Sequence, residues 1–301
     1  MPENGCDDFK GREKMAQSGQ MLLRVWDVQH GACAMLHHQI NGSAGRLAMI
    51  DSGCTATWRP STFIKYGLGR QRLDYLFITN ADQDHMKDLQ GLWDEGIDVP
   101  VWFHNPSPST DNWRDMKLSG GPLTDDARRF IANCEDFQGT PAEPFNLNMG
   151  GITCTTFYNP YPQFTNTNDL SLVIFVEFDG FKIVFPGDME KPGWRALLQR
   201  PDFCAELRDT NILVASHHGR ESGFCPEIFN YFTPDAVVIS DKPIEHETQK
   251  MVPDYSRVVR DSGVRVRSTG KDRHVLTTRR DGWIQFTVSD GRYFIDTEYA
   301  G

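Results

Sequence analysis

The 301-residue sequence lacks a paired-cysteine motif and an apolar run of membrane-spanning length. No Cys-x-x-Cys pair occurs, and the seven cysteines are an odd number scattered along the chain. No apolar run is long enough to cross a bilayer, since the longest, residues 170–178, is short and contains Glu177. We therefore expect reduced thiols, a cytoplasmic location and no association with a membrane.

Positive charge is also scarce. The chain has 31 Lys and Arg against 41 Asp and Glu, which gives a formal net charge of −10. Because contact with nucleic-acid phosphates depends mainly on Lys and Arg, this balance excludes a general nucleic-acid-binding surface, although it permits a small basic cleft. Residues 1–20 are polar without periodicity and are expected to form a flexible N-terminal tail. Residues 21–301 are long enough for a single domain.

One stretch, residues 76–85 (LFITNADQDH), dominates the remaining sequence. Its apolar beginning predicts a short strand buried on both faces, and a helix is expected from Met86 onward. Polar side chains that follow a buried strand at once are typical of the sites of α/β proteins. Here they are Asn80, Asp82, Asp84 and His85, whose oxygen and nitrogen donors indicate one half of a metal site.

The same arrangement recurs three times further along the chain. Asp188 follows the predicted strand 181–185, His217 and His218 follow strand 211–215, and His246 comes shortly after strand 236–240. A single carboxylate after a strand is usually a cap or a turn residue. Four such positions in order favour the metal site of a hydrolase.

These residues carry a resemblance to a known family. Asn80-x-Asp82-x-Asp84-His85 resembles a variant of the His-x-His-x-Asp-His signature of the metallo-β-lactamase-fold hydrolases, and in particular of the hydrolase domains of competence DNA-uptake channel proteins. Asp51-Ser52-Gly53 resembles the Asp-x-Gly turn of that family, in which we expect Asp51 to accept hydrogen bonds from backbone amides.

The order of strands and helices favours an α/β fold with two facing sheets. The resemblance implies a four-layer αββα sandwich of the metallo-β-lactamase type. Residues from about 105 to 151 are rich in Pro, Ser, Gly and Asn, and are too long for a plain connection. We expect them to be a surface insertion with one helix, at residues 124–134, where Thr124 is the cap.

By the same resemblance, one metal position is intact. Its nitrogen and oxygen donors suit Zn²⁺ or Mn²⁺ and would come from Asp84, His85, Asp188 and one of His217 or His218. The sequence leaves open which of these two histidines binds the ion. The other could bind a phosphate or protonate a leaving group.

A second metal position is expected to be weak or absent. It would use Asn80, Asp82 and Asp188, but Asn80 stands where the family has a histidine. The family also has a further histidine before the bridging carboxylate, and none lies between His104 and His217. Two alternatives remain open, one tightly bound and one labile ion, or the loss of the second ion.

The expected function is that of a metal-dependent hydrolase, namely a phosphodiesterase or nuclease that acts on nucleic acid or nucleotides through a metal-bound hydroxide. Asp84 and His218 are the expected catalytic residues, and Asp82 could take the proton of the water. The residues expected to bind substrate are His246, Arg220 and His30.

Two other functions remain open. Asn80 and the missing histidine could abolish the chemistry, which would leave a binding or regulatory subunit with protein partners in a multi-component system such as antiphage defence. Hydrolysis of an ester, lactone or thioester is a further alternative.

Overall fold

The computed structural model describes residues 19–137 and 139–299. Most of the predicted tail therefore lies outside the described residues, and the first strand begins at Gln20. Within the described residues no helix is both long enough and apolar enough to cross a membrane.

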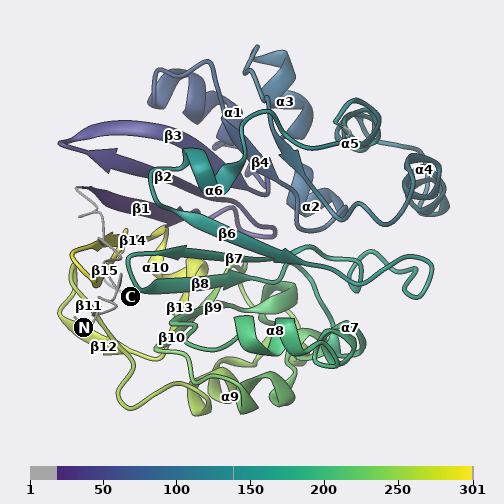
Figure 1. Cartoon of the computed structure of the whole chain (residues 1–301). Coiled ribbons are helices and arrows are strands. Elements are labelled where there is room, and N and C mark those ends of the chain that lie inside the picture. The colour runs from purple at the N-terminus through teal and green to yellow at the C-terminus, as the bar shows by residue number, and fades with distance from the viewer. Residues whose placement is uncertain (1–18, 138, 300–301) are drawn as a thin grey trace, which may run out of the picture.

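Two mixed β-sheets face each other in the middle of the molecule (Figure 1). The larger has nine strands in the order β12 (Lys271–Arg273), β11 (Val264–Val266), β15 (Arg292–Thr297), β14 (Ile284–Ser289), β1 (Gln20–Val25), β2 (Ala34–Ile40), β3 (Ser43–Ile50), β4 (Tyr75–Phe77) and β5 (Trp102–Phe103). The smaller has six, in the order β13 (Val275–Thr277), β10 (Ala236–Ile239), β9 (Ile212–Val214), β8 (Phe181–Phe185), β7 (Val173–Phe178) and β6 (Thr153–Phe157).

Helices lie on the outer side of each sheet (Figure 1). The larger sheet is flanked by α1 (Pro60–Thr62), α2 (Gln83–Met86), α3 (Leu89–Asp94), α4 (Thr110–Ser119) and α5 (Asp125–Asp136). The smaller sheet is flanked by α7 (Lys191–Leu197), α8 (Pro201–Glu206) and α9 (Val252–Arg257). Two short helices, α6 (Phe145–Asn148) and α10 (Thr278–Asp281), complete the set of α-helices in the described part of the chain.

Three hydrophobic clusters account for these layers. The central cluster packs the inner faces of the two sheets together, because alternate residues of each strand point inward. The second cluster joins the outer face of the larger sheet to α3 and α5, and the third joins the smaller sheet to α7 and α8. The predicted α/β class is confirmed. That the sandwich is of the metallo-β-lactamase type stays a prediction.

Parallel pairing brings the polar strand ends together. β3, β4 and β5 run parallel in one sheet, and β8, β9, β10 and β13 run parallel in the other. The carboxyl ends of parallel strands meet at one edge of a sheet, which is where α/β proteins place their sites. The turns after β4, β8 and β9 carry most of the predicted site residues.

The prediction of a single helix between residues 105 and 151 was wrong, since the segment contains α4, α5 and α6. The signal for α4 is present in the sequence. Ser109 is its N-cap, and Ser109 and Asn112 form a reciprocal capping box. The predicted helix at residues 124–134 is α5, capped by Thr124 as expected. The capping signal of α4 is difficult to recognise in the sequence because the segment is rich in proline and glycine.

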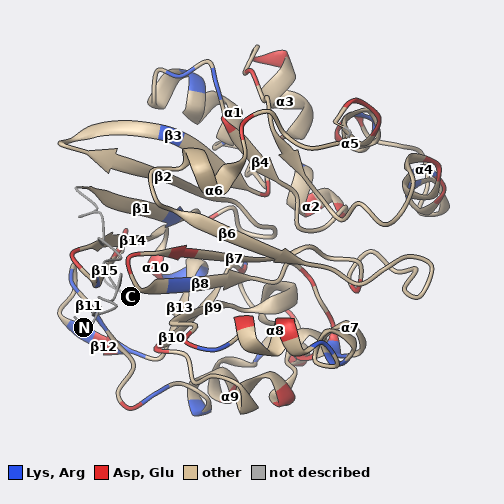
Figure 2. Cartoon of the chain, in the orientation of Figure 1, with Lys and Arg blue, Asp and Glu red and all other residues tan. Residues whose placement is uncertain are grey.

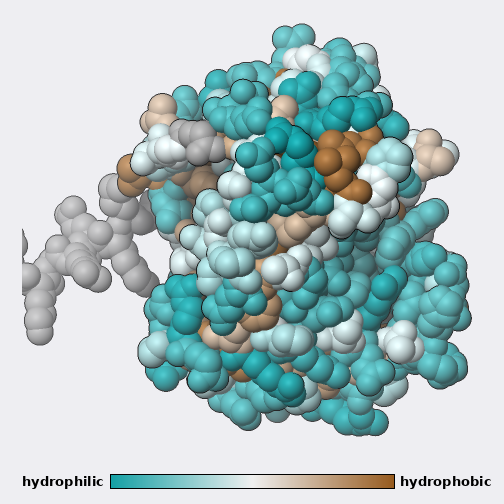
Figure 3. Space-filling view, turned by 90° about the vertical axis from the view of Figure 1, so that its right-hand side faces the viewer, coloured by the Kyte–Doolittle hydropathy of each residue, from teal (hydrophilic) through white to brown (hydrophobic). Residues whose placement is uncertain are grey.

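The side of the molecule seen in Figure 3 is mostly hydrophilic, with one compact hydrophobic patch in its upper part. Acidic residues outnumber basic ones on the outer helices α5 and α8 (Figure 2). The negative formal charge of the chain is therefore carried in part by its outer helical layers.

The contact between the two sheets should dominate stability. The ring of Phe286 on β14 is fully buried and lies 5.7 Å from that of Phe181 on β8. Phe286→Ala is expected to lower the free energy of unfolding by about 3–5 kcal/mol, measured by urea denaturation. Phe294→Ala on the neighbouring strand is the control, because Phe294 is 36% exposed and should cost about 1 kcal/mol or less. Equal losses for the two variants would contradict this account of the core.

Candidate metal centre

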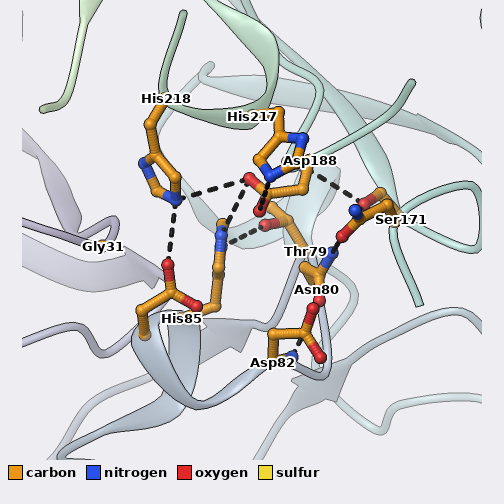
Figure 4. A network of polar contacts seen from close by, with 12 residues as sticks. Gly31, Thr79, Asn80, Asp82, His85, Ser171, Asp188, His217 and His218 are labelled. Atoms are coloured by element: carbon orange, nitrogen blue, oxygen red, sulfur yellow. Dashed lines mark hydrogen bonds and ion pairs between the residues drawn. The ribbon is translucent and has the colours of Figure 1, made fainter. Parts of the chain in front are cut away.

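Four side chains converge where the turns of the two sheets meet. Asp84 and His85 come from α2, Asp188 from the turn after β8, and His218 from the 3₁₀ turn η2 (Ser216–Gly219) after β9. Each offers one donor atom, and the four atoms all lie within 4.8 Å of one another. Figure 4 shows His85, His218 and Asp188 pointing toward one another. Two carboxylates and two imidazoles form a donor set that suits Zn²⁺ or Mn²⁺.

His85 has a carboxylate at each ring nitrogen. Its Nε2 lies 3.0 Å from Asp188 Oδ1, and its Nδ1 lies 2.9 Å from Asp51 Oδ2. A carboxylate oxygen only accepts hydrogen bonds, and a neutral imidazole has a single N–H. One of the two contacts is therefore unsatisfied unless the ring gains a second proton or a cation lies between the atoms.

His218 also needs a proton or a cation at one ring nitrogen, and in this case the hydrogen bonds fix which nitrogen it is. Its Nδ1 lies 3.0 Å from the carbonyl oxygen of Ser240, which can only accept, so Nδ1 carries the hydrogen. Its Nε2 then presents a lone pair to two carboxylates, 3.0 Å from Asp84 Oδ2 and 3.5 Å from Asp188 Oδ1. A backbone carbonyl behind one ring nitrogen is the usual way in which proteins orient a metal-binding histidine.

The pKa shifts of the cluster residues also indicate a need for positive charge. Burial alone would lower the pKa of His85, but the charges of Asp188 and Asp51 outweigh it and hold that pKa well above its usual value. Burial alone would raise the pKa of Asp188, but the neighbouring His85 and His218 outweigh it and lower that pKa to about 2. The buried cluster requires positive charge, which protons or a divalent ion can supply.

The local backbone is bent to bring these groups inward. His217 and His218 have φ values of 51° and 53°, in the left-handed region that costs free energy for residues other than glycine. Gly187, beside Asp188, also has a positive φ of 59°. A Cβ atom at this position would lie 2.9 Å from Thr79 Oγ1 and 3.0 Å from Ser171 Oγ, so only glycine allows this approach.

Asp51 supports the centre from behind. The prediction that it accepts a hydrogen bond from a backbone amide is confirmed, since the Thr79 N–H donates to Asp51 Oδ1 at 2.7 Å. Sequence reasoning missed its second oxygen, which faces His85 Nδ1 and accepts from Thr79 Oγ1 at 2.6 Å. The parallel pairing of β3 with β4 is the signal that could have placed Asp51 beside the strand that leads to His85.

The two candidate histidines of the double-histidine motif have different places. His218 belongs to the cluster, whereas His217 Nε2 lies 3.9 Å from Asp188 Oδ2. The Nδ1 atom of His217 lies 3.0 Å from both Glu190 Oε1 and Ser222 Oγ. The geometry therefore favours His218 as the ligand and puts His217 beside the cluster.

Of the predicted substrate-binding residues, two lie at the rim of the centre. His30 Nε2 is 3.4 Å from Asp84 Oδ2, and a guanidinium nitrogen of Arg220 is 3.4 Å from His217 Nε2. His246 is exposed, and its backbone N–H donates to Gln249 Oε1. The roles of all three residues stay predictions.

Asn80 and Asp82, the expected ligands of a second ion, lie apart from the four-residue cluster. Asn80 Nδ2 is 3.3 Å from Ser171 Oγ, and the carboxylate of Asp82 contacts Lys117 and Thr167. Figure 4 shows these two residues to one side of the convergent histidines.

Comparison with known proteins gives one relevant relative by sequence. No protein-family model matches the chain. ComE operon protein 3 from Bacillus subtilis (strain 168) is 22% identical over 192 residues, a match that covers 61% of this chain and 22% of that protein. The chain is thus similar to about a fifth of the relative's length. The match confirms the resemblance that the motifs indicated.

Two solved structures have a weak similarity to the chain. A protein from Parabacteroides distasonis ATCC 8503, described as a candidate metal-dependent hydrolase, is 13% identical with a TM-score of 0.42, over 85% of this chain and 93% of that one. A protein of unknown function from Enterococcus faecalis V583 is 12% identical with a TM-score of 0.36, over 65% of this chain and 49% of that one. Neither likeness is strong enough to assign an activity.

Removal of a single central carboxylate should abolish metal binding. The protein purified with Zn²⁺ or Mn²⁺ should retain about one ion per chain, measured by plasma mass spectrometry. Asp188→Asn should retain almost none, because the uncharged amide neither balances the charge of the ion nor replaces the lost carboxylate oxygen. Asp202→Asn, at an exposed acid in the first turn of α8, should bind metal like the wild type. Equal metal contents in both variants would contradict the assignment.

Loss of the Asp51 carboxylate should weaken metal binding. Asp51→Asn leaves the four cluster residues in place but replaces the charged partner of His85 Nδ1 with an amide. The affinity for Zn²⁺, measured by competition with a chelating dye, should fall about 10–100-fold. An unchanged affinity would show that the carboxylate behind His85 does not act on the ion.

Proposed function

We propose that the protein is a metal-dependent hydrolase, a phosphodiesterase or nuclease that acts on nucleic acid or nucleotides in the cytoplasm. The observation that carries the proposal is the cluster of Asp84, His85, Asp188 and His218, in which imidazole Nε2 atoms and carboxylate oxygens face a common point. Zn²⁺ or Mn²⁺ is the proposed ion, because both accept mixed nitrogen and oxygen donors. The similarity to ComE operon protein 3 supports a metallo-β-lactamase type of sandwich around it.

A phosphate group as the target is supported by the cations at the rim. Within the described chain the guanidinium of Arg220 makes no polar contact other than that with His217, so its remaining donors can bind a substrate. Burial lowers the pKa of His30, the charge of Asp84 opposes this, and the positive charges of Arg220 and Lys242 reinforce it. Positive groups thus lie at the rim of the metal centre although the chain as a whole is acidic.

The chain's own residues have distinct tasks in this reaction. When bound, the ion supplies a hydroxide nucleophile near neutral pH and neutralises charge that develops on the phosphoryl group. Arg220 and His30 hold the phosphoryl oxygens at the rim. His217 is oriented by Glu190 and Ser222 at its Nδ1, and when the ring carries a second proton its Nε2 can give that proton to the leaving oxygen.

The cysteines and the surface charge support a cytoplasmic location and protein partners. The six described cysteines are all free thiols, as expected for a cytoplasmic protein. The outer helices α5 and α8, which carry more acidic than basic residues, offer surfaces for basic partner proteins, which fits a component of a larger assembly (Figure 2).

A second function is favoured by one observation. Asn80 and Asp82 contact neighbouring protein groups and lie outside the four-residue cluster. In this second proposal the centre is too reduced for catalysis and the fold is a binding or regulatory subunit of a multi-protein system.

Hydrolysis assays with added Mn²⁺ or Zn²⁺ separate these functions. Single-stranded DNA, a cyclic dinucleotide, bis(p-nitrophenyl) phosphate and p-nitrophenyl acetate are offered to the wild type and to Asp188→Asn. We expect the wild type to cleave at least one phosphodiester and the variant to be slower by about a hundredfold or more. A wild type that binds metal but cleaves none of the phosphodiesters would favour the binding role, and cleavage of the acetate alone would favour an esterase.

The role of His217 is tested by the choice of leaving group. His217→Gln should slow the cleavage of DNA, whose alkoxide leaving group needs a proton, by about a hundredfold. Cleavage of bis(p-nitrophenyl) phosphate should slow far less, because nitrophenolate leaves without protonation. Equal losses on both substrates would instead make His217 a residue that positions the centre.

A further inference from the structure

The carboxylate of Asp82 is already paired with a lysine. Lys117 Nζ lies 3.1 Å from Asp82 Oδ1, and the hydroxyl of Thr167 donates to Asp82 Oδ2 at 2.9 Å. Lys117 lies in the last turn of α4, within the predicted insertion, and its side chain is only 16% exposed. Both oxygens of the expected ligand therefore have protein partners, one of which is a cation.

Asn80 cannot turn its oxygen to an ion without breaking the local backbone structure. Its Oδ1 accepts the backbone N–H of Asp82 at 2.7 Å. Since an N–H can only donate, this contact fixes which end of the amide is oxygen. The Nδ2 end then points to Asn168 Oδ1 at 3.2 Å and to Ser171 Oγ at 3.3 Å. An amide nitrogen that donates hydrogen bonds is not a metal ligand.

This donating group lies next to the cluster. Ser171 Oγ also accepts the backbone N–H of Asp188 at 3.1 Å, so a single hydroxyl links the amide of Asn80 to the backbone of the central residue. Asn80 therefore presents an amide donor beside Asp188, where a second ion would need an acceptor. Beyond that donor lies the pair of Asp82 and Lys117. The groups present do not fit a second ion.

We propose that the centre works with one metal ion, and that the ammonium of Lys117 takes the place of the second cation by binding a phosphoryl oxygen of the substrate. The ammonium has three N–H donors, and Asp82 uses one of them. The described residues offer no other polar partner to Lys117 Nζ, so two donors remain for the substrate. The inference rests on the proposed phosphodiesterase function and assigns its substrate-binding cation.

Asp82 has a different task in this proposal from the one expected of it. It holds the lysine in place, because the ion pair restricts the long side chain of Lys117 and the hydrogen bond from Thr167 fixes the carboxylate. A fixed ammonium is a common partner for phosphate oxygens. Lys117 touches the substrate, and Asp82 is a positioning residue.

Two binding measurements test the proposal. Wild-type protein at saturating Mn²⁺ should bind one ion per chain by titration calorimetry, whereas two ions would overturn it. In the metal-loaded protein, inorganic phosphate is the probe. Lys117→Gln should weaken phosphate binding about tenfold or more while the affinity for Mn²⁺ stays within about twofold.

Two further variants serve as controls. Lys87→Gln removes the same charge from an exposed lysine directly after α2 and should change neither affinity. Lys117→Arg keeps the charge and should retain most of the phosphate affinity, which guards against a folding defect in the glutamine variant. Phosphate binding that is absent in the wild type, or equal in the wild type and Lys117→Gln, would overturn the role of the lysine.

The outcomes are separable from those of the proposed function. Hydrolysis of a phosphodiester together with two bound ions, or with phosphate binding independent of Lys117, would remove this inference and leave the proposed activity intact. One ion and Lys117-dependent phosphate binding without hydrolysis would keep the inference about the site and remove the activity.

Discussion

The structure depends on a group of buried acceptors that face one another. The imidazole Nε2 atoms of His85 and His218 and the carboxylates of Asp84 and Asp188 are all directed at one small volume. Such an arrangement is unfavourable unless positive charge occupies it, because buried polar atoms of like sign repel and lack solvent. The contacts of the two Nδ1 atoms leave the rings no alternative direction. The packing of these side chains therefore requires positive charge at this point.

Much of the fold follows from the sequence by elementary rules. Short apolar runs such as residues 76–78 and 212–214 are buried parallel strands, and the polar residues after them reach the same edge as expected. The hairpin at Asp179 and Gly180 joins β7 and β8. Strand ends are predictable because hydrophobic burial stops where polar side chains begin.

The detailed geometry of the centre could not be read in the same way. Nothing in the order of residues distinguishes His217 from His218, since the difference arises from two consecutive left-handed residues that turn the rings apart. The contact between Lys117 and Asp82 joins residues 35 positions apart, through a helix whose segment appeared to be mainly loop. Sequence patterns describe periodic burial, whereas these contacts depend on the tertiary course of irregular segments.

The origin of the four donors has a mechanical consequence. Asp84 and His85 follow a strand of the larger sheet, while Asp188 and His218 follow strands of the smaller one. Near the same place the hydroxyl of Ser240, after β10, donates to the carbonyl of Gly31, after β1. An ion at this point would cross-link the two halves of the sandwich. Its loss would let that end of the molecule open further, which would raise the hydrogen exchange and lower the protease resistance of the turns on both sides.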